Sequence, residues 1–240
     1  MLKAEHLTKK FGELVAVNDL DFHVRPGQIF GIAGPNGAGK STVFNLITGN
    51  FDYEGTIRFD GRDISGLPPH KIARMGIART FQTPQTFPSL TVEKSIAVGS
   101  RFGSGKGFDL GHVNAIIRFM ALGDDRKRRT AELNLLGKKK LMIAAALASR
   151  PRLLLLDEPM AGSNASEIRE LMGLIRRINQ EMGVSILIIE HFMKVLTELT
   201  DHLLIIETGR AICEGDPETV TRHPDVIETY LGGGACAACG

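Results

Sequence analysis

The chain has 240 residues and a mass of 26.1 kDa, with 43% hydrophobic and 23% charged residues. This is an ordinary globular composition, which excludes an intrinsically disordered or fibrous protein. Lysine and arginine number 29 against 27 acidic residues, so the formal net charge of +2 gives no electrostatic argument for nucleic-acid binding.

The apolar runs and the N-terminal residues indicate where in the cell the protein is found. The longest apolar run, residues 141–148, is far shorter than the ~20 residues that a membrane-spanning helix needs. Residues 1–6 carry charges where a signal peptide would be apolar, so we expect a cytoplasmic protein. Cys236 and Cys239 lie in a glycine-rich tail, where a frayed terminus is favoured over a metal or redox site.

The first third of the chain alternates short β-like runs with turn residues. Strands are expected over residues 14–17, 21–24 and 56–59, and an apolar strand over residues 28–33 is followed by glycine. Apolar residues at helical spacing then predict a helix over residues 40–48, which Gly49 ends.

Helical patterns and continuous apolar runs dominate the rest of the chain. Residues 99–111 are glycine-rich and polar, so a loop is expected there, followed by helices over 113–122 and 139–148. The apolar runs 153–156 and 184–189 are typical of strands buried on both faces, and a helix over 165–182 joins them in a βαβ crossover. Residues 203–206 and 211–213 predict a closing hairpin.

These elements together predict an α/β fold. We expect a mostly parallel sheet with flanking helices, an N-terminal antiparallel β subdomain and a helical insertion. The whole chain is expected to form a single domain, with a core over about 1–81 and 149–231, the insertion over about 82–148 and a flexible tail over 232–240.

The strongest chemical signal is the segment 34–41, which reads Gly-Pro-Asn-Gly-Ala-Gly-Lys-Ser. It fits the phosphate-binding loop pattern and lies between a predicted strand and a predicted helix, which disfavours the alternative of an ordinary glycine-rich turn. Glycines let backbone N–H groups approach phosphate, Lys40 would neutralise the β- and γ-phosphates, and Ser41 would ligate Mg²⁺. The predicted nucleotide-binding residues of this segment are Gly34, Pro35, Asn36, Gly37, Ala38, Gly39, Lys40, Ser41 and Thr42.

Two carboxylates follow the apolar run 153–156. Asp157 stands at the tip of a buried parallel strand, where open α/β sheets bind ligands, and is expected to contact Mg²⁺. Glu158 is positioned to accept a proton from an attacking water. Alone, this pair would more often be a solvated strand end, but its combination with the phosphate loop favours the functional interpretation.

With these motifs the sequence resembles the ATP-binding-cassette (ABC) ATPase family from residue 1 to about 231. The resemblance implies that Gln82 touches Mg²⁺ and the lytic water, that His191 contacts the γ-phosphate and that Phe11 stacks on adenine. In the alternative interpretations, Gln82 is an ordinary polar loop residue, His191 is a hydrogen-bonded histidine at a strand end, and Phe11 is a core aromatic residue. Order and spacing favour the family role for Gln82 and His191 and leave Phe11 open. The implied catalytic residues are thus Lys40, Gln82, Glu158 and His191, and the metal ligands are Ser41, Gln82 and Asp157.

The family's signature segment, Leu-Ser-Gly-Gly-Gln, aligns with residues 133–137, which read Leu-Asn-Leu-Leu-Gly. The resemblance implies that Asn134 donates a hydrogen bond to the γ-phosphate bound by the opposite subunit. Leu136 stands where the family has glycine, unless a one-residue deletion places Gly137 there. The departures leave a second hypothesis open, a nucleotide-dependent dimerising switch with weak hydrolysis.

Residues 44–49, 67–82 and 224–232 resemble the larger ATPase subunit of branched-chain amino acid importers. The lipopolysaccharide-export ATPase has a similar ending and is the alternative. The resemblance implies an ATPase that uses ATP and Mg²⁺ at the cytoplasmic face of the inner (plasma) membrane. Its implied partners are two membrane permease subunits, a second ABC ATPase subunit and, indirectly, an external solute-binding protein, with no nucleic acid.

Overall fold

The structure is a computed structural model that describes residues 1–103 and 107–231. Cys236 and Cys239, and the tail predicted over 232–240, lie outside the described residues. The chain forms two compact units, one made of residues 1–68 with the chain from 187 onward, the other of residues 69–186. The core-and-insertion division expected from the sequence stays a prediction.

The first unit contains a four-stranded antiparallel sheet, which agrees with the β subdomain predicted near the N-terminus. The strand order is β2-β1-β4-β5, where the strands are β1 (Leu2–Phe11), β2 (Leu14–Val24), β4 (Glu54–Phe59) and β5 (Arg62–Asp63). The predicted runs 14–17 and 21–24 are one continuous strand, β2. Strand β1 was not predicted, because most of its residues are polar and register shifts at three places in its pairing with β2 interrupt the period-two pattern.

A second set of strands in the first unit leads to the phosphate loop. Strand β3 (Ile29–Ala33) is buried along its whole length, pairs in parallel with β9 (His202–Glu207), and β9 pairs antiparallel with β10 (Arg210–Gly215). The hairpin predicted at this position is therefore confirmed. The helices of this unit are α1 (Lys40–Ile47), α7 (Met193–Leu199), α8 (Pro217–Thr221) and α9 (Pro224–Leu231).

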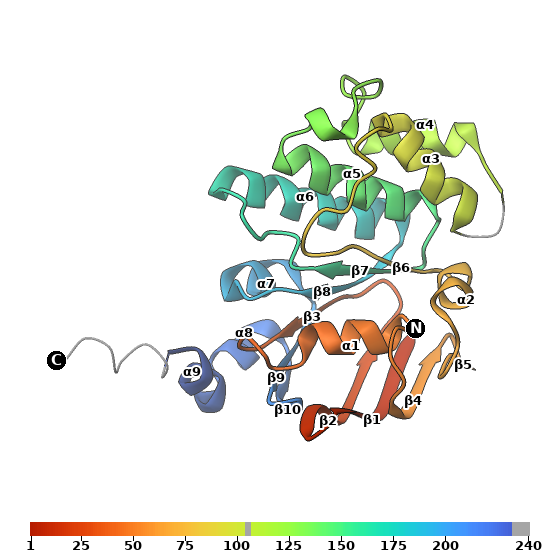
Figure 1. The fold of residues 1–240 in the computed structure, drawn as a ribbon. Helices are drawn as coiled ribbons and strands as arrows, with labels where there is room; N and C mark the ends of the chain where they lie inside the picture. Colours follow the sequence, from red (N-terminus) through yellow and green to blue (C-terminus); the bar gives the residue numbers. More distant parts are fainter. Residues whose placement is uncertain (104–106, 232–240) are drawn as a thin grey trace. The chain divides into compact units, whose positions relative to one another are not determined.

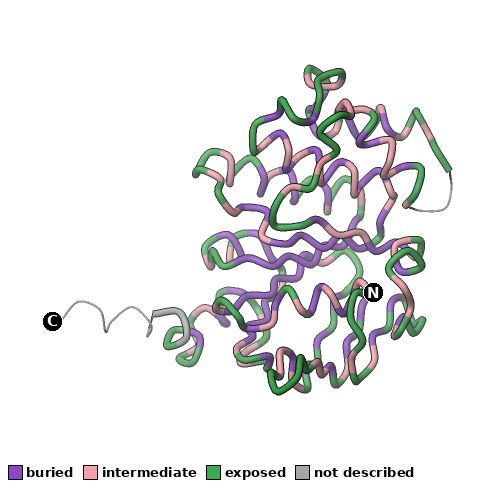
Figure 2. The backbone as a smooth tube through the Cα atoms, in the orientation of Figure 1, coloured by how far each residue is buried: buried purple, intermediate pink, exposed green. Residues whose placement is uncertain are grey.

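The second unit combines two parallel strands with most of the longer helices (Figure 1). Strand β6 (Ile77–Arg79) pairs in parallel with β7 (Leu153–Asp157). Strand β7 is buried along its whole length, as is β3 of the first unit (Figure 2). Strand β8 (Ser185–Ile189) returns the chain to the first unit. The helices are α2 (Pro69–Arg74), α3 (Val92–Phe102), α4 (Leu110–Phe119), α5 (Leu135–Ala148) and α6 (Ala165–Met182), with a 3₁₀ turn at Thr130–Glu132.

Helix α6 has the bounds that the sequence predicts, because both of its ends carry strong local signals. The Asn164 side chain accepts hydrogen bonds from the first-turn amides, and the Glu167 side chain accepts one from the Asn164 amide. Gly183 ends the helix in the left-handed conformation. Leu171, Ile175 and other apolar residues form its buried stripe. No helix among the described residues is long and apolar enough to cross a bilayer.

The loop expected over residues 99–111 is wrong at both ends, because α3 continues to Phe102 and α4 begins at Leu110. The Thr91 side chain caps this helix by accepting a hydrogen bond from the Lys94 amide. Gly99, which suggested a loop, instead permits close helix packing: a Cβ there would lie 2.0 Å from the Ala145 carbonyl oxygen of α5. The glycine is needed for a contact that is distant in sequence, which a local pattern does not reveal.

The capping of α6 gives a prediction about stability. Replacing Asn164 by Ala should lower the free energy of unfolding by about 1 kcal/mol, because two first-turn amides lose their acceptor. Asn164→Asp is the matched control, since aspartate accepts the same bonds, and its effect should stay within a few tenths of a kcal/mol. Urea denaturation of the three proteins measures the difference. Equal stability of the Ala and Asp variants would contradict the assigned cap.

Candidate active site

The predicted site residues fall into both units of the chain. The phosphate loop, Phe11 and His191 belong to the first unit, whereas Gln82, Asn134, Gly137, Asp157 and Glu158 belong to the second.

The phosphate loop joins the buried strand β3 to helix α1, in the order that the sequence predicts. Gly34 and Gly39 both have backbone conformations that favour glycine, with φ of 156° and 98°. A Cβ at Gly34 would lie 2.1 Å from the Ile206 carbonyl oxygen, and one at Gly39 would lie 2.2 Å from the Ala16 carbonyl oxygen. Neighbouring backbone therefore requires glycine at both ends of the loop. Between them Asn36 and Gly37 are exposed.

The start of α1 provides hydrogen-bond donors and positive charge for an anion. Gly39 occupies the N-cap position, and no side chain caps the helix. The first N–H groups of a helix have no partner within it, so this end is suited to phosphate oxygens. The Lys40 side chain is buried and donates hydrogen bonds to the carbonyls of Gly34 (2.7 Å) and Pro35 (2.8 Å), which holds its ammonium over the loop. Ser41 is exposed and Thr42 half-buried.

Two further predicted residues of the first unit lie at its surface. Phe11 is 42% exposed, which excludes the core-aromatic alternative, and its ring meets Phe51 edge-on at 5.2 Å between centroids. His191 follows β8 and is also exposed, with its ring 4.2 Å from that of Phe192. Their contacts with adenine and with the γ-phosphate stay predictions.

Asp157 ends β7 as predicted, after four leucines that are fully buried. Its Oδ2 accepts a hydrogen bond of 2.8 Å from Nη2 of Arg79, and both side chains are more than nine-tenths buried. Within the described residues, Oδ1 of Asp157 has no hydrogen bond, which leaves this oxygen for a cation. Carboxylate, hydroxyl and amide oxygens are the ligands that Mg²⁺ prefers, so Asp157, Ser41 and Gln82 fit the metal in their chemistry.

Glu158 and Gln82 are in direct contact in the second unit. Nε2 of Gln82 donates a hydrogen bond of 2.6 Å to Oε2 of Glu158, although 76 positions separate the two residues in sequence. Glu158 has a φ of 44°, a left-handed backbone conformation that is uncommon for a residue other than glycine. Such strain is concentrated at functional sites, and here it occurs at the residue predicted to act as base.

The segment that aligns with the family signature forms the start of helix α5. Oδ1 of Asn134 accepts a hydrogen bond of 2.8 Å from the Gly137 amide and so caps the helix. This bond leaves the amide NH₂ of the exposed Asn134 as a donor. Gly137 is buried, and a Cβ there would lie 3.3 Å from that of Leu133. The contact of either residue with a nucleotide of an opposite subunit stays a prediction.

The sequence did not point to two basic residues next to the site. Arg79 pairs with Asp157, and Lys139 donates hydrogen bonds to the segment that follows Glu158. Arg79 lies within a predicted family segment but carried no assigned role, and Lys139 belongs to a run of three lysines that indicated only the start of a helix. Arg79 is 78 positions from its partner in the sequence, and Lys139 is up to 24 positions from its partners, so only the fold shows these contacts.

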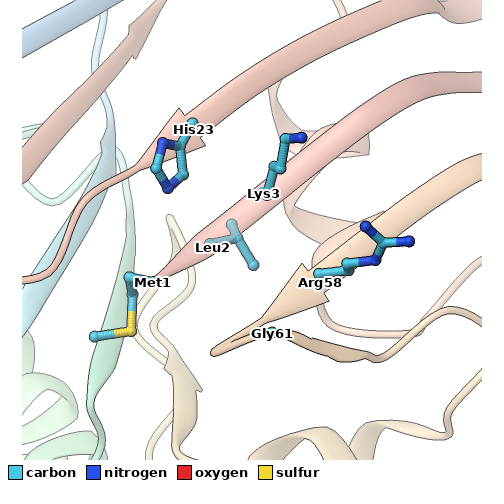
Figure 3. A pocket seen from close by; sticks show the side chains of 6 residues that line it. All are labelled: Met1, Leu2, Lys3, His23, Arg58 and Gly61. Carbon is cyan, nitrogen blue, oxygen red and sulfur yellow. The ribbon is translucent and has the colours of Figure 1, made fainter.

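The first unit also has a cavity of about 370 Å³ that none of the predicted site residues lines (Figure 3). The strand register places Lys3 between His23 and Arg58 on three adjacent strands. Both Lys3 and Arg58 form ion pairs with Glu5, at 2.7 Å and 3.7 Å. Burial and the nearby cations lower the pKa of His23, which favours its neutral form.

Comparison with known proteins relates this geometry to a family. The profile described as ABC transporter matches residues 17–161, and the profile described as branched-chain amino acid ATP-binding cassette transporter matches residues 212–236. The chain is 36% identical to the high-affinity branched-chain amino acid transport ATP-binding protein BraF of Pseudomonas aeruginosa, over 97% of this chain and 98% of that protein. It is 33% identical to the corresponding LivG of Escherichia coli K12, again over 97% and 98% of the two chains.

A solved structure confirms the fold class. The crystal structure of the ADP conformation of MJ1267, an ATP-binding cassette of an ABC transporter, is 31% identical and superposes with a TM-score of 0.88. The match covers 97% of this chain and 98% of that one. The resemblance inferred from the motifs is thereby confirmed, and the comparisons favour the amino-acid importer relatives over the export alternative.

The crowding at the phosphate loop predicts unequal effects of two glycine substitutions. Gly34→Ala should lower the free energy of unfolding by roughly 3 kcal/mol or more, because the new Cβ would overlap the Ile206 carbonyl. Gly61→Ala is the control: Gly61 also has a positive φ, but nothing lies within 4 Å of its Cβ position, so about 1–2 kcal/mol is expected. Urea denaturation compares the variants, and equal losses would contradict the assigned contact.

Proposed function

Because the chain belongs to the ABC transporter family and is an ATPase cassette, we propose that it powers a membrane importer of branched-chain amino acids or related small polar solutes. The observation that carries the solute class is the match of residues 212–236 to the branched-chain amino acid profile. The near full-length similarity to BraF and LivG, which are named as transport ATP-binding proteins, supports the same class.

In this proposal the phosphate loop binds the triphosphate of ATP. The uncapped start of α1 and the loop amides donate hydrogen bonds to phosphate oxygens, and the Lys40 ammonium neutralises the β- and γ-phosphates. Ser41, Gln82 and Asp157 hold Mg²⁺, which when bound would offset the negative charge of the phosphates. Phe11 stacks on adenine, and its exposure in the structure supports a role outside the core.

Hydrolysis is assigned to the carboxylate that the structure holds in a strained backbone conformation. Glu158 accepts a proton from the attacking water, and its hydrogen bond from Gln82 orients the carboxylate before the nucleotide arrives. His191 contacts the γ-phosphate. Asn134 and Gly137, at the start of α5, serve the nucleotide of the opposite subunit when two cassettes close on two ATP molecules.

The proposed partners follow from the family and from the relatives. We infer two membrane permease subunits, a second ABC ATPase subunit and, indirectly, an external solute-binding protein. The protein would then lie peripherally on the cytoplasmic face of the membrane. Closure of the cassettes on ATP would move the permeases, and hydrolysis would reset them.

Replacement of the proposed base tests the chemistry. Glu158→Gln keeps the size and hydrogen-bonding capacity of the side chain but removes its basicity, so steady-state Mg²⁺-ATP turnover should fall on the order of 100-fold or more. Glu228→Gln, at an exposed position of α9, is the control and should leave turnover unchanged. Unchanged turnover in Glu158→Gln would rule out Glu158 as the base. A wild-type chain that binds ATP without turning it over would favour the switch hypothesis.

Purification from native membranes tests the partners. When the tagged chain is extracted in mild detergent, we expect two permeases and a second cassette protein to accompany it, because an import ATPase must contact them to act. Mass spectrometry identifies the co-purified proteins. Export permeases with an envelope-bridging protein would instead assign the chain to lipopolysaccharide transport and contradict the importer proposal.

A further inference from the structure

Lys139, on the second turn of α5, is a lysine in an unusual environment. The residue is only 2% exposed, although it lies within a run of three lysines. Its Nζ donates hydrogen bonds to the Ala161 carbonyl and to Oγ of Ser163, the latter at 2.7 Å. A buried ammonium needs hydrogen-bond acceptors to offset its loss of hydration. The Ala161 carbonyl and the Ser163 hydroxyl are therefore held in place by Lys139.

The acceptors belong to the segment that joins the proposed base to helix α6. This segment is folded into two successive turns, in which the Ala161 amide donates to the Glu158 carbonyl and the Ser163 amide donates to the Met160 carbonyl, both at 3.1 Å. Lys139 therefore binds the turn that begins at Glu158. A displacement of this turn would change the direction of the Glu158 side chain.

Other contacts join α5 to the same region. A Cβ at Gly162 would lie 3.4 Å from Cδ2 of Leu135, so the first turn of α5 lies directly against the segment. Lys140 forms an ion pair with Glu170 of α6. On the other side, the Phe81 amide, next to Gln82, contacts Sδ of Met142 at 3.4 Å. Helix α5 thus touches the chain beside both members of the Gln82–Glu158 pair.

We propose that Lys139 is a positioning residue for ATP hydrolysis, one that holds the turn after Glu158 against the helix that begins at Asn134. This inference rests on the proposed function of Glu158 and adds a requirement to it. The buried ammonium links the helix that serves the opposite subunit's nucleotide to the carboxylate that acts within its own chain. A helix shift at α5 is then transmitted to Glu158 through Ala161 and Ser163.

The proposal predicts a loss of turnover without a loss of binding. Lys139→Met removes the charge and all donors while filling similar space, and kcat should fall by about 10- to 100-fold, because displacement of a catalytic group by about 1 Å has effects of this order. The KM for ATP should change by less than about twofold, since Lys139 is not assigned to nucleotide binding. Lys138→Met is the matched control, because the half-buried Lys138 side chain forms no hydrogen bond or ion pair with the described residues.

A double-mutant cycle separates positioning from general stability. Ser163→Ala should lower kcat by roughly threefold, because the Ala161 carbonyl still holds the ammonium, and the double variant should resemble Lys139→Met alone. Additive losses would mean that Lys139 does not act through Ser163. Urea denaturation checks that each variant is folded at the assay temperature.

Hydrogen exchange provides a readout that does not depend on activity. In the nucleotide-free full chain, the amides of Ala161 and Ser163 should exchange faster in Lys139→Met than in the wild type or Lys138→Met. Unchanged exchange, or wild-type kcat in Lys139→Met, would overturn the positioning role and leave Glu158 as the base. A wild-type chain without turnover would instead contradict the proposed function, and the exchange result would then decide the role of Lys139 by itself.

Discussion

The buried ion pair between Arg79 and Asp157 fixes the arrangement on which the proposed chemistry depends. The pair joins the last residues of two adjacent parallel strands, β6 and β7, at 2.8 Å. The next residue after Asp157 is Glu158, and Gln82 follows Arg79 closely, so a fixed pairing of the two strand ends brings these side chains together. Loss of one partner would leave a buried charge, which typically costs about 3–5 kcal/mol.

The phosphate loop depends on a different constraint, the absence of side chains. Backbone carbonyls of Ala16 and Ile206 lie where a Cβ of Gly39 or Gly34 would be, so the residues that suit phosphate are also required by the packing of the strands around them. The resulting loop leaves the start of α1 without a side-chain cap and places Lys40 over its carbonyls. Packing and anion binding thus select the same residues.

Local signals in the sequence predicted much of this correctly. The phosphate loop, the two carboxylates and helix α6 were found because each depends on neighbours in the chain: glycines before a helix, polar residues after an apolar strand, a helical segment between two apolar runs. The comparisons confirm the fold class and the family. The binding and catalytic roles of individual residues are predictions that mutants must test.

The features that were missed depend on contacts between distant segments. Strand β1 is polar and bulged, and only its pairing with β2 and β4 identifies it as a strand. Gly99 suggested a loop because the close approach of Ala145 is not visible in the sequence. Lys139 is one of three consecutive lysines, and only the fold shows which of them is buried against the turn after Glu158. In each case a long-range contact overrides the local pattern.

Uptake of radiolabelled leucine by whole cells shows whether this ATPase powers solute import. Cells that lack the gene would be complemented with the wild-type chain or with Lys40→Ala, which removes the ammonium from the phosphate loop, and both proteins would be checked for equal abundance. The wild type should restore concentrative uptake, and Lys40→Ala should not. Equal uptake with both proteins, or no difference between the deletion strain and its parent, would contradict a role in import.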